Sequence, residues 1–209
     1  MVALVNLSSG IVAFGANLPR SGHQPWGTLR QAASIVHATP DISITALSRF
    51  WKSRAVPDGS GPDFVNAVAL IRTTLDARAV LARLHDIEAQ AGRDRSTGRW
   101  SARVLDLDLI ALDDAVLPDP ESLGRWMDLA PNDQARHVPD QLLLPHPRMH
   151  ERAFVLAPLA EIAPLWSHPF LGKNTTQMLA ALDNHAMEGL SPLELSLEEW
   201  LDNDGIGHH

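Results

Sequence analysis

The alternation of leucine and aspartate from Leu105 to Leu109 constrains the fold more than any other stretch of this sequence. Successive side chains of a β-strand point to opposite faces, so the leucines would share one face and Asp106 and Asp108 the other. Such a strand needs an apolar layer on one side and a polar environment on the other. The sequence therefore predicts a strand that is buried on one side and presents two carboxylates on the opposite side.

Arginines are concentrated in the segment directly before this strand, namely Arg93, Arg95, Arg99 and Arg103. Paired carboxylates can bind hard cations such as Mg²⁺, and planar guanidinium groups bind phosphate oxygens. Taken alone, an Asp-x-Asp pair on a half-buried strand is more often a solvated face, and an arginine-rich loop is usually a surface loop. Their direct succession favours a polyphosphate site in which two Mg²⁺ ions are held by the aspartates.

Composition excludes several classes of function. The 209 residues include 17 Lys plus Arg and 25 Asp plus Glu, which gives a net charge of −8 and argues against binding to nucleic acid or to an anionic membrane. The absence of cysteine removes disulfides, thiolate metal ligands and a cysteine nucleophile. No apolar run approaches the roughly 20 residues of a membrane span, and the N-terminal residues lack a signal-peptide pattern. We therefore expect a cytoplasmic protein.

The other periodic segments predict an α+β fold with an antiparallel sheet and helices on one face. Asp76 is expected to cap a helix that ends before Gly92. The order of elements is β-α-β-β-α-β, which is typical of ferredoxin-like folds. Strands are expected at 10–14, 42–51, 64–72 and 105–109, and helices at 28–38 and 76–91.

We expect one domain over residues 1–209, with a core at about 10–185 and a tail at about 186–209. Residues 113–141 are polar and rich in proline without a sustained period, which indicates an insertion that carries a short helix near 121–129. Further helices are expected at 151–162, despite Pro158, and at 175–182 and 191–200.

Five spaced motifs follow one another between about residues 11 and 163. They are Ala13-Phe-Gly-Ala-Asn-Leu18, Phe64-Val-Asn-Ala-Val68, Glu88 with Gly92-Arg-Asp-Arg95, Arg99-Trp-Ser-Ala-Arg-Val-Leu-Asp-Leu-Asp108 and Pro145-His-Pro-Arg-Met-His-Glu-Arg-Ala-Phe-Val155. In this order they resemble the 6-hydroxymethyl-7,8-dihydropterin pyrophosphokinase family of folate biosynthesis. The resemblance implies transfer of pyrophosphate from ATP to the pterin alcohol, which yields AMP and the pterin diphosphate.

The same resemblance implies a role for individual residues. Asp106 and Asp108 would bind two Mg²⁺ ions, with Arg93 and Arg103 as further catalytic residues. Two aromatic faces and a side-chain amide would suit a flat pterin with a polar rim. The implied ATP contacts are Glu88, Arg95, Arg99, Trp100, His146 and Arg152, and the implied pterin contacts are Gly15, Ser53, Val56, Phe64, Asn66 and Phe154.

The sequence departs from the family pattern at two places. Ser101-Ala102 stand where many members have Gly-Pro, and residues 53–56 replace a common Thr-Pro-Pro-Leu segment. A generic Mg²⁺ phosphohydrolase, in which water replaces the pterin, is the alternative enzyme, and an RNA-binding or regulatory module is the alternative without catalysis. The net charge of −8 argues against RNA. We expect a monofunctional, monomeric enzyme.

Overall fold

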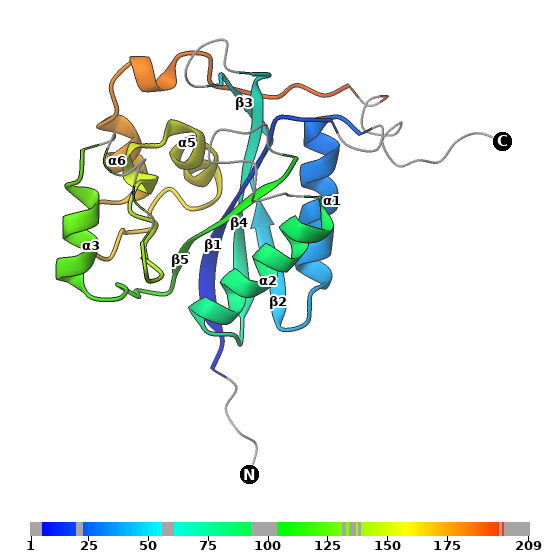
Figure 1. The fold of residues 1–209 in the computed structure, drawn as a ribbon. Helices are drawn as coiled ribbons and strands as arrows, with labels where there is room; N and C mark the ends of the chain where they lie inside the picture. Colours follow the sequence, from blue (N-terminus) through cyan, green and yellow to red (C-terminus); the bar gives the residue numbers. More distant parts are fainter. Residues whose placement is uncertain are drawn as a thin grey trace.

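A six-stranded antiparallel sheet organises the chain (Figure 1). The computed structural model describes residues 6–19, 23–55, 61–92, 104–130, 133, 137, 139–196 and 198. The strand order is β5-β1-β4-β3-β6, and β2 also pairs with β4. Along the chain the elements run β-α-β-β-β-α-β as far as β5, which is the predicted β-α-β-β-α-β pattern with its second strand divided in two. The strands are β1 (Ser8–Ala16), β2 (Ile42–Leu47), β3 (Trp51–Ser53), β4 (Phe64–Thr73), β5 (Asp106–Leu112) and β6 (Ser191–Pro192).

Helices cover both faces of the sheet. The core helices α1 (Pro25–Ala38) and α2 (Ala77–Gln90) pack on one face, as predicted, over a core that contains Phe14 and Leu107. The C-terminal helices α5 (Ala153–Ile162) and α6 (Thr175–Ala180) lie over the opposite face, with a core that includes Ile110. Short 3₁₀ helices span Met149–Glu151 and His185–Met187. No described helix is long and apolar enough to cross a bilayer.

Local signals account for the helix boundaries. Asp76 Oδ1 accepts the Ala79 backbone N–H at 2.8 Å and so caps α2, as predicted. Gly92 follows that helix with a φ of 85°, a conformation that glycine adopts without strain. Helix α1 begins three residues before the predicted position, because Pro25 has no N–H to satisfy and fits the first turn of a helix.

The predicted strand at 42–51 is interrupted at residues 48–50, which separate β2 from β3. Ser48 replaces the regular pairing with β4, since its N–H donates to Val68 O at 2.9 Å and its Oγ accepts the Val68 N–H at 3.0 Å. A side chain that competes for strand hydrogen bonds is a tertiary effect, and the alternation of apolar residues does not predict it.

The predicted helix at 191–200 is wrong at its start, because Ser191–Pro192 form strand β6 beside β3. Leu193 N–H donates to Phe50 O at 2.7 Å, and both Leu193 and Leu195 pack against the core beneath α1 and α2. Residues 193 and 195 are two apart, which is the spacing of one strand face. Proline is tolerated on an edge strand of this kind.

The excursion at 113–141 carries helix α3 (Pro120–Met127), close to the predicted helix near 121–129. Asp119 Oδ1 caps it by accepting the Ser122 N–H at 2.8 Å, and Leu123 anchors it as a fully buried side chain. An isolated bridge between Leu117 and Leu144 closes the excursion. The chain therefore returns to the sheet two residues before His146.

His168 fixes the loop between α5 and α6. Its Nδ1 accepts the backbone N–H groups of Phe170 at 3.3 Å and Leu171 at 3.2 Å, and the side chain is fully buried. Burial, and then the nearby His150, lowers the pKa of His168 to about 4. The ring is therefore neutral at pH 7, with its proton on Nε2, for which the described residues offer no hydrogen-bond acceptor.

Acidification is expected to destabilise the fold through His168. The unfolded chain binds this proton near pH 6.5 and the folded chain only near pH 4, so the contribution is complete above about pH 6.5 and declines as the pH falls towards 4. Urea denaturation between about pH 7 and pH 4.5 measures the slope. In His168→Asn, whose Oδ1 can accept the same two N–H groups, the slope should be shallower by at most about 1.4 kcal/mol per pH unit. Equal slopes would contradict the assignment.

Candidate active site

Asp106 and Asp108 project from the face of β5 opposite to Leu105, Leu107 and Leu109, which are all buried. Both aspartates are half-buried, and their face of the sheet is the one that α5 covers. Asp108 Oδ2 lies 3.5 Å from Nη1 of Arg152, the residue directly before α5. The positively charged Arg152 at the start of α5 therefore lies next to the carboxylates of β5.

Arg152 connects the carboxylates with an aromatic ring. Burial lowers the pKa of Arg152, whereas the neighbouring Asp108 and Asp106 counteract that shift. Its guanidinium carbon lies 5.7 Å from the centre of the Phe154 ring. Phe154 belongs to the first turn of α5 and is 37% exposed, which is unusual for a large aromatic side chain. An exposed aromatic next to a charged cluster suits ligand binding better than core packing.

His146 lies close to the same charged groups. Its backbone N–H donates to Ile110 O of β5 at 2.8 Å, and its Nδ1 accepts the Arg148 N–H at 3.1 Å. Burial, followed by the positive charge of Arg152, lowers the pKa of His146 to about 3. The ring is therefore neutral near pH 7 and carries its proton on Nε2, where it can donate a hydrogen bond to an anionic oxygen.

Glu88 is buried behind β5 and does not project into solvent from α2. Its Oε1 accepts the Leu107 backbone N–H at 2.8 Å, and Leu107 stands between the two aspartates. In the described sheet β5 is the edge strand, so only one side of β5 has a strand neighbour. Glu88 thereby fixes the backbone that carries both carboxylates.

Gly15 occupies the centre of a row of residues across three strands. It pairs with Asn66 on β4 and with Asp106 on β5, so the three residues face the same side of the sheet. A Cβ atom at position 15 would lie 3.7 Å from Asn66 Oδ1 and 3.8 Å from Asp106 Cβ. The backbones of Asn66 and Asp106 are two strand spacings apart, roughly 10 Å, and their side chains flank the space above Gly15.

Asn66 is oriented by strand β3. Its Nδ2 donates to Ser53 Oγ at 2.9 Å and to Trp51 O at 3.4 Å, and the residue is 5% exposed. Because the amide nitrogen is engaged with β3, the carbonyl Oδ1 on the Gly15 side is the acceptor available to a ligand. Phe64 pairs with Ser53 at the same end of the β3–β4 ladder. Three of the predicted pterin contacts therefore lie together.

Comparison with known proteins identifies the family of this chain. Residues 11–164 match the family model of 7,8-dihydro-6-hydroxymethylpterin-pyrophosphokinase, abbreviated HPPK. The chain belongs to the HPPK family. It is therefore an enzyme, a pyrophosphokinase of folate biosynthesis that uses ATP as co-substrate.

Two curated relatives of this HPPK chain are named 2-amino-4-hydroxy-6-hydroxymethyldihydropteridine pyrophosphokinase. The protein of Synechocystis sp. is 33% identical over 186 residues, which cover 88% of this chain and 82% of the relative. The protein of Haemophilus influenzae is 30% identical over 181 residues, which cover 87% of this chain and 97% of the relative. Both matches extend over most of each protein.

Solved structures support the fold. The Plasmodium falciparum HPPK-DHPS crystal structure with pteroate matches 91% of this chain with a TM-score of 0.63 and 11% identity, and the match spans 46% of that longer chain. A second crystal structure of the same protein gives a TM-score of 0.56 over 84% of this chain. At this level of identity the likeness concerns the fold alone.

Several predicted site residues of this HPPK chain lie outside the described residues, namely Val56, Arg93, Arg95, Arg99, Trp100 and Arg103. Sequence reasoning missed Trp51, whose carbonyl oxygen orients Asn66. It also missed the contact between Arg49 and Glu161, because these residues are 112 positions apart. The alternation of β3 could have indicated Trp51, whereas no local pattern links Arg49 with Glu161.

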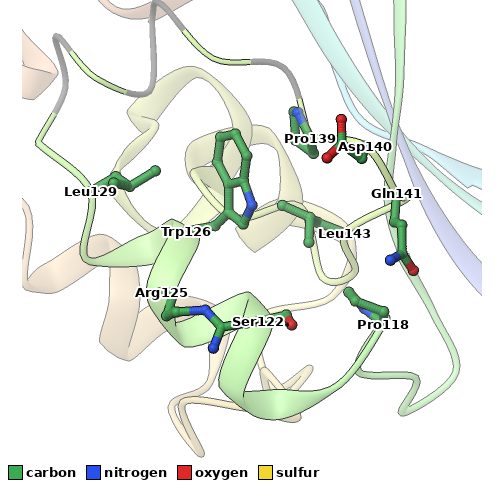
Figure 2. A pocket seen from close by; sticks show the side chains of 9 residues that line it. All are labelled: Pro118, Ser122, Arg125, Trp126, Leu129, Pro139, Asp140, Gln141 and Leu143. Atoms are coloured by element: carbon green, nitrogen blue, oxygen red, sulfur yellow. Dashed lines mark hydrogen bonds between the residues drawn. The ribbon is translucent and has the colours of Figure 1, made fainter.

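A pocket of about 200 Å³ lies in a different part of the molecule, between α3 and residues 139–143 (Figure 2). None of the predicted site residues lines it. We therefore assign the active site from the chemistry of its side chains. The residues that line the pocket are Pro118, Ser122, Arg125, Trp126, Leu129, Pro139, Asp140, Gln141 and Leu143.

The two aspartates fit Mg²⁺ better than a structural metal. Within the described residues, no group of three or more His, Cys, Asp or Glu side chains is arranged to hold a metal ion. Mg²⁺ commonly binds one or two carboxylates and takes its remaining ligands from water and substrate phosphates. Asp106 and Asp108, half-exposed on one strand face, form a donor set of that kind.

Proposed function

We propose that this enzyme transfers the β- and γ-phosphates of ATP as one unit to the hydroxymethyl group of 6-hydroxymethyl-7,8-dihydropterin. The observation that carries the proposal is the row Asn66, Gly15 and Asp106 across β4, β1 and β5. It supports a heterocycle site at one end and a phosphate site at the other. A bicyclic ring above Gly15 would contact Asn66 with its polar rim, and its alcohol would reach towards the carboxylates.

Recognition of the pterin would depend on its faces and its rim. Phe154 on α5 and Phe64 on β4 would contact the two faces of the ring, and Asn66 Oδ1 would accept a hydrogen bond from an N–H group at the ring edge. The Ser53 hydroxyl, which accepts from Asn66, retains its own proton for donation. Val56 is proposed as a further contact. This combination favours a flat ring with a polar rim over an aliphatic alcohol.

Asp106 and Asp108 would hold two Mg²⁺ ions. When bound, these ions supply charge neutralisation at the phosphates and lower the pKa of the attacking hydroxyl. Arg152 and the His146 Nε2–H group would donate to phosphate oxygens, and Glu88 would act on the nucleotide site through β5. From the arginine-rich segment we propose Arg93 and Arg103 as catalytic residues and Arg95, Arg99 and Trp100 as ATP contacts.

The proposed reaction does not require a protein side chain as general base. The hydroxyl oxygen attacks the β-phosphorus, the bond from that phosphorus to the oxygen bridging the α- and β-phosphates breaks, and AMP leaves. His146 is unsuited to take the hydroxyl proton, because its Nδ1 already accepts the Arg148 N–H and its pKa is about 3. The proton therefore passes to solvent, and alignment and charge neutralisation dominate catalysis.

Product analysis tests this function directly. The protein is incubated with Mg-ATP and 6-hydroxymethyl-7,8-dihydropterin, and the products are separated by ion-exchange chromatography and identified by ³¹P NMR. We expect AMP and pterin diphosphate in equal amounts, and no AMP when the pterin is omitted. Release of ADP or free phosphate independently of the pterin would instead establish the phosphohydrolase.

A further inference from the structure

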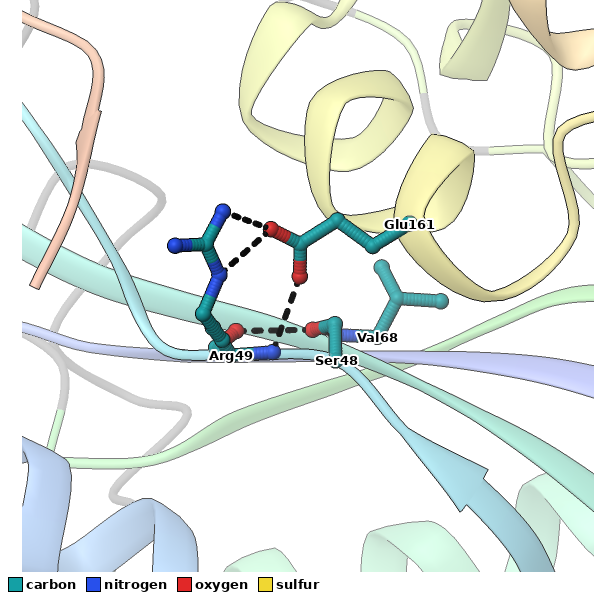
Figure 3. Close-up of polar contacts among 4 residues, drawn as sticks. All are labelled: Ser48, Arg49, Val68 and Glu161. Carbon is teal, nitrogen blue, oxygen red and sulfur yellow. Dashed lines mark hydrogen bonds and ion pairs between the residues drawn. The ribbon is translucent and has the colours of Figure 1, made fainter.

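Arg49 and Glu161 contact each other, and neither is among the predicted site residues. Arg49 lies between β2 and β3, and Glu161 lies in the last turn of α5 (Figure 3). Glu161 Oε1 accepts from Arg49 Nε at 2.8 Å and from Arg49 Nη2 at 2.6 Å. Glu161 Oε2 accepts the Arg49 backbone N–H at 3.0 Å. One carboxylate therefore fixes both the side chain and the backbone of Arg49.

This contact joins the two elements that carry the proposed pterin contacts. Glu161 follows Phe154 by seven residues, close to two helical turns, so both side chains lie on the same side of α5. Arg49 precedes Ser53 by four residues, and Ser53 in turn accepts from Asn66. Helix α5 packs against β3 and β4. The contact between Arg49 and Glu161 is therefore one of those that hold α5 against β3 and β4.

The β4 side of the same segment is also fixed. Ser48 exchanges two hydrogen bonds with the Val68 backbone. Its Oγ also donates to the Arg49 carbonyl oxygen at 2.8 Å, as Figure 3 shows. The Arg49 guanidinium carbon lies 5.9 Å from the centre of the Trp51 ring, next to the carbonyl that orients Asn66. Residues 48–51 are thus attached to the sheet on one side and to α5 on the other.

The energetic consequence of the contact is small, and its geometric consequence is large. The Arg49 side chain is 65% exposed, and ion pairs in such positions add little to folding stability. Three hydrogen bonds to one carboxylate nevertheless restrict position and orientation, because charge-assisted bonds in a two-pronged arrangement are directional. A contact of this kind affects the position of the residues that surround a ligand more than it affects the free energy of unfolding.

We propose that Arg49 and Glu161 are positioning residues that set the width of the pterin slot between α5 and β3–β4. This inference depends on the proposed function, because it assigns the slot to the pterin. Neither residue touches the substrate. Loss of the contact lets the Phe154 side of α5 and the Ser53 side of β3 move apart, which weakens pterin binding and leaves the nucleotide site at Asp106 and Asp108 unchanged.

Graded removal of the hydrogen bonds tests the proposal. Glu161→Ala removes all three bonds, whereas Arg49→Ala removes the two side-chain bonds and retains the bond from the backbone N–H. The pterin Kd, measured by fluorescence titration with a non-hydrolysable ATP analogue present, is expected to rise on the order of tenfold in Glu161→Ala and less in Arg49→Ala. The KM for ATP should change by less than about twofold in both.

Arg125→Ala is the matched control. Arg125 pairs with Glu121 on α3 at 2.6 Å and its side chain is also 65% exposed, but α3 carries none of the proposed site residues. This variant should keep the wild-type pterin Kd. The double variant Arg49→Ala/Glu161→Ala should lie close to Glu161→Ala alone, because adding Arg49→Ala removes no further hydrogen bond and only the contact with the Trp51 ring.

Three results distinguish a failure of the positioning role of Arg49 and Glu161 from a failure of the proposed function. An unchanged pterin Kd in Glu161→Ala, or equal changes in the pterin and ATP parameters, would overturn the positioning role. Thermal melting of each variant reports on folding, and a lower Tm with an unchanged pterin Kd would likewise show a merely structural contact. Failure of the wild-type protein to form pterin diphosphate would instead refute the proposed function.

Discussion

Asp106→Ala and Asp108→Ala are each expected to lower kcat by on the order of a thousandfold, about 4 kcal/mol of transition-state stabilisation. The two carboxylates lie on the same face of β5 but at different positions, and both are proposed to bind Mg²⁺, so neither can substitute for the other. Both side chains are half-exposed, and the buried leucines of β5 remain in place. The fold should therefore persist while turnover is lost.

Kinetics and thermal melting measure the two effects separately. Single-turnover assays at saturating Mg-ATP give the chemical rate, and a Tm close to that of the wild type shows that β5 is intact. Asp86→Ala provides the control, since Asp86 is an exposed aspartate of α2 whose ion pair with Arg83 spans 4.0 Å. Retention of more than about a tenth of the rate, a loss below roughly 1.4 kcal/mol, would exclude the metal role.

Glu88→Ala is expected to impair both stability and activity, although Glu88 need not touch ATP. The substitution leaves the buried Leu107 N–H without its acceptor, which costs about 1–3 kcal/mol of unfolding free energy. It also releases the backbone between Asp106 and Asp108. Loss of such a supporting contact typically costs about 10–100-fold in metal affinity or activity. Glu88→Gln keeps an acceptor oxygen and should retain most of the function.

The Mg²⁺ concentration at half-maximal rate distinguishes support of the site from general destabilisation. Val80→Ala, a fully buried change two turns earlier on α2, should lower the Tm without altering the Mg²⁺ requirement. Glu88→Ala should raise that requirement, and Glu88→Gln should restore it towards the wild-type value. If Glu88→Gln were as impaired as Glu88→Ala, the negative charge of Glu88 rather than its hydrogen bond to Leu107 would be the important property.

Much of the fold could be predicted from sequence because its signals are local. The alternation of leucine and aspartate identified β5, and Asp76 with Gly92 delimited α2. The interruption at Ser48 and the strand at Ser191–Pro192 could not be predicted, since each depends on a partner strand distant in the sequence. Strand β6 in particular has too few residues to show a period of its own.

The candidate site could likewise be predicted only in part from the sequence. Sequence motifs selected Asp106, Asn66 and Gly15 individually, but only the register of β1 with β4 and β5 brings them into one row. The hydrogen bond of Glu88 could not be predicted, because its partner is a backbone N–H 19 residues later. The type of a side chain predicts which reactions it can support. Hydrogen bonds between distant segments determine which side chains lie close together.

Gly15 has a consequence for inhibitor resistance. A molecule that competes with the substrate by spanning from Asn66 to Asp106 must pass over Gly15, where the missing Cβ leaves room. A Cβ atom at position 15 would meet Asn66 and Asp106 at ordinary contact distances, so alanine fits the protein itself. On the proposed function it would narrow the space for an inhibitor and for the substrate alike. On the proposed function, a substitution at position 15 that weakens such a compound would weaken substrate binding as well, so contacts above Gly15 are favourable for inhibitor design.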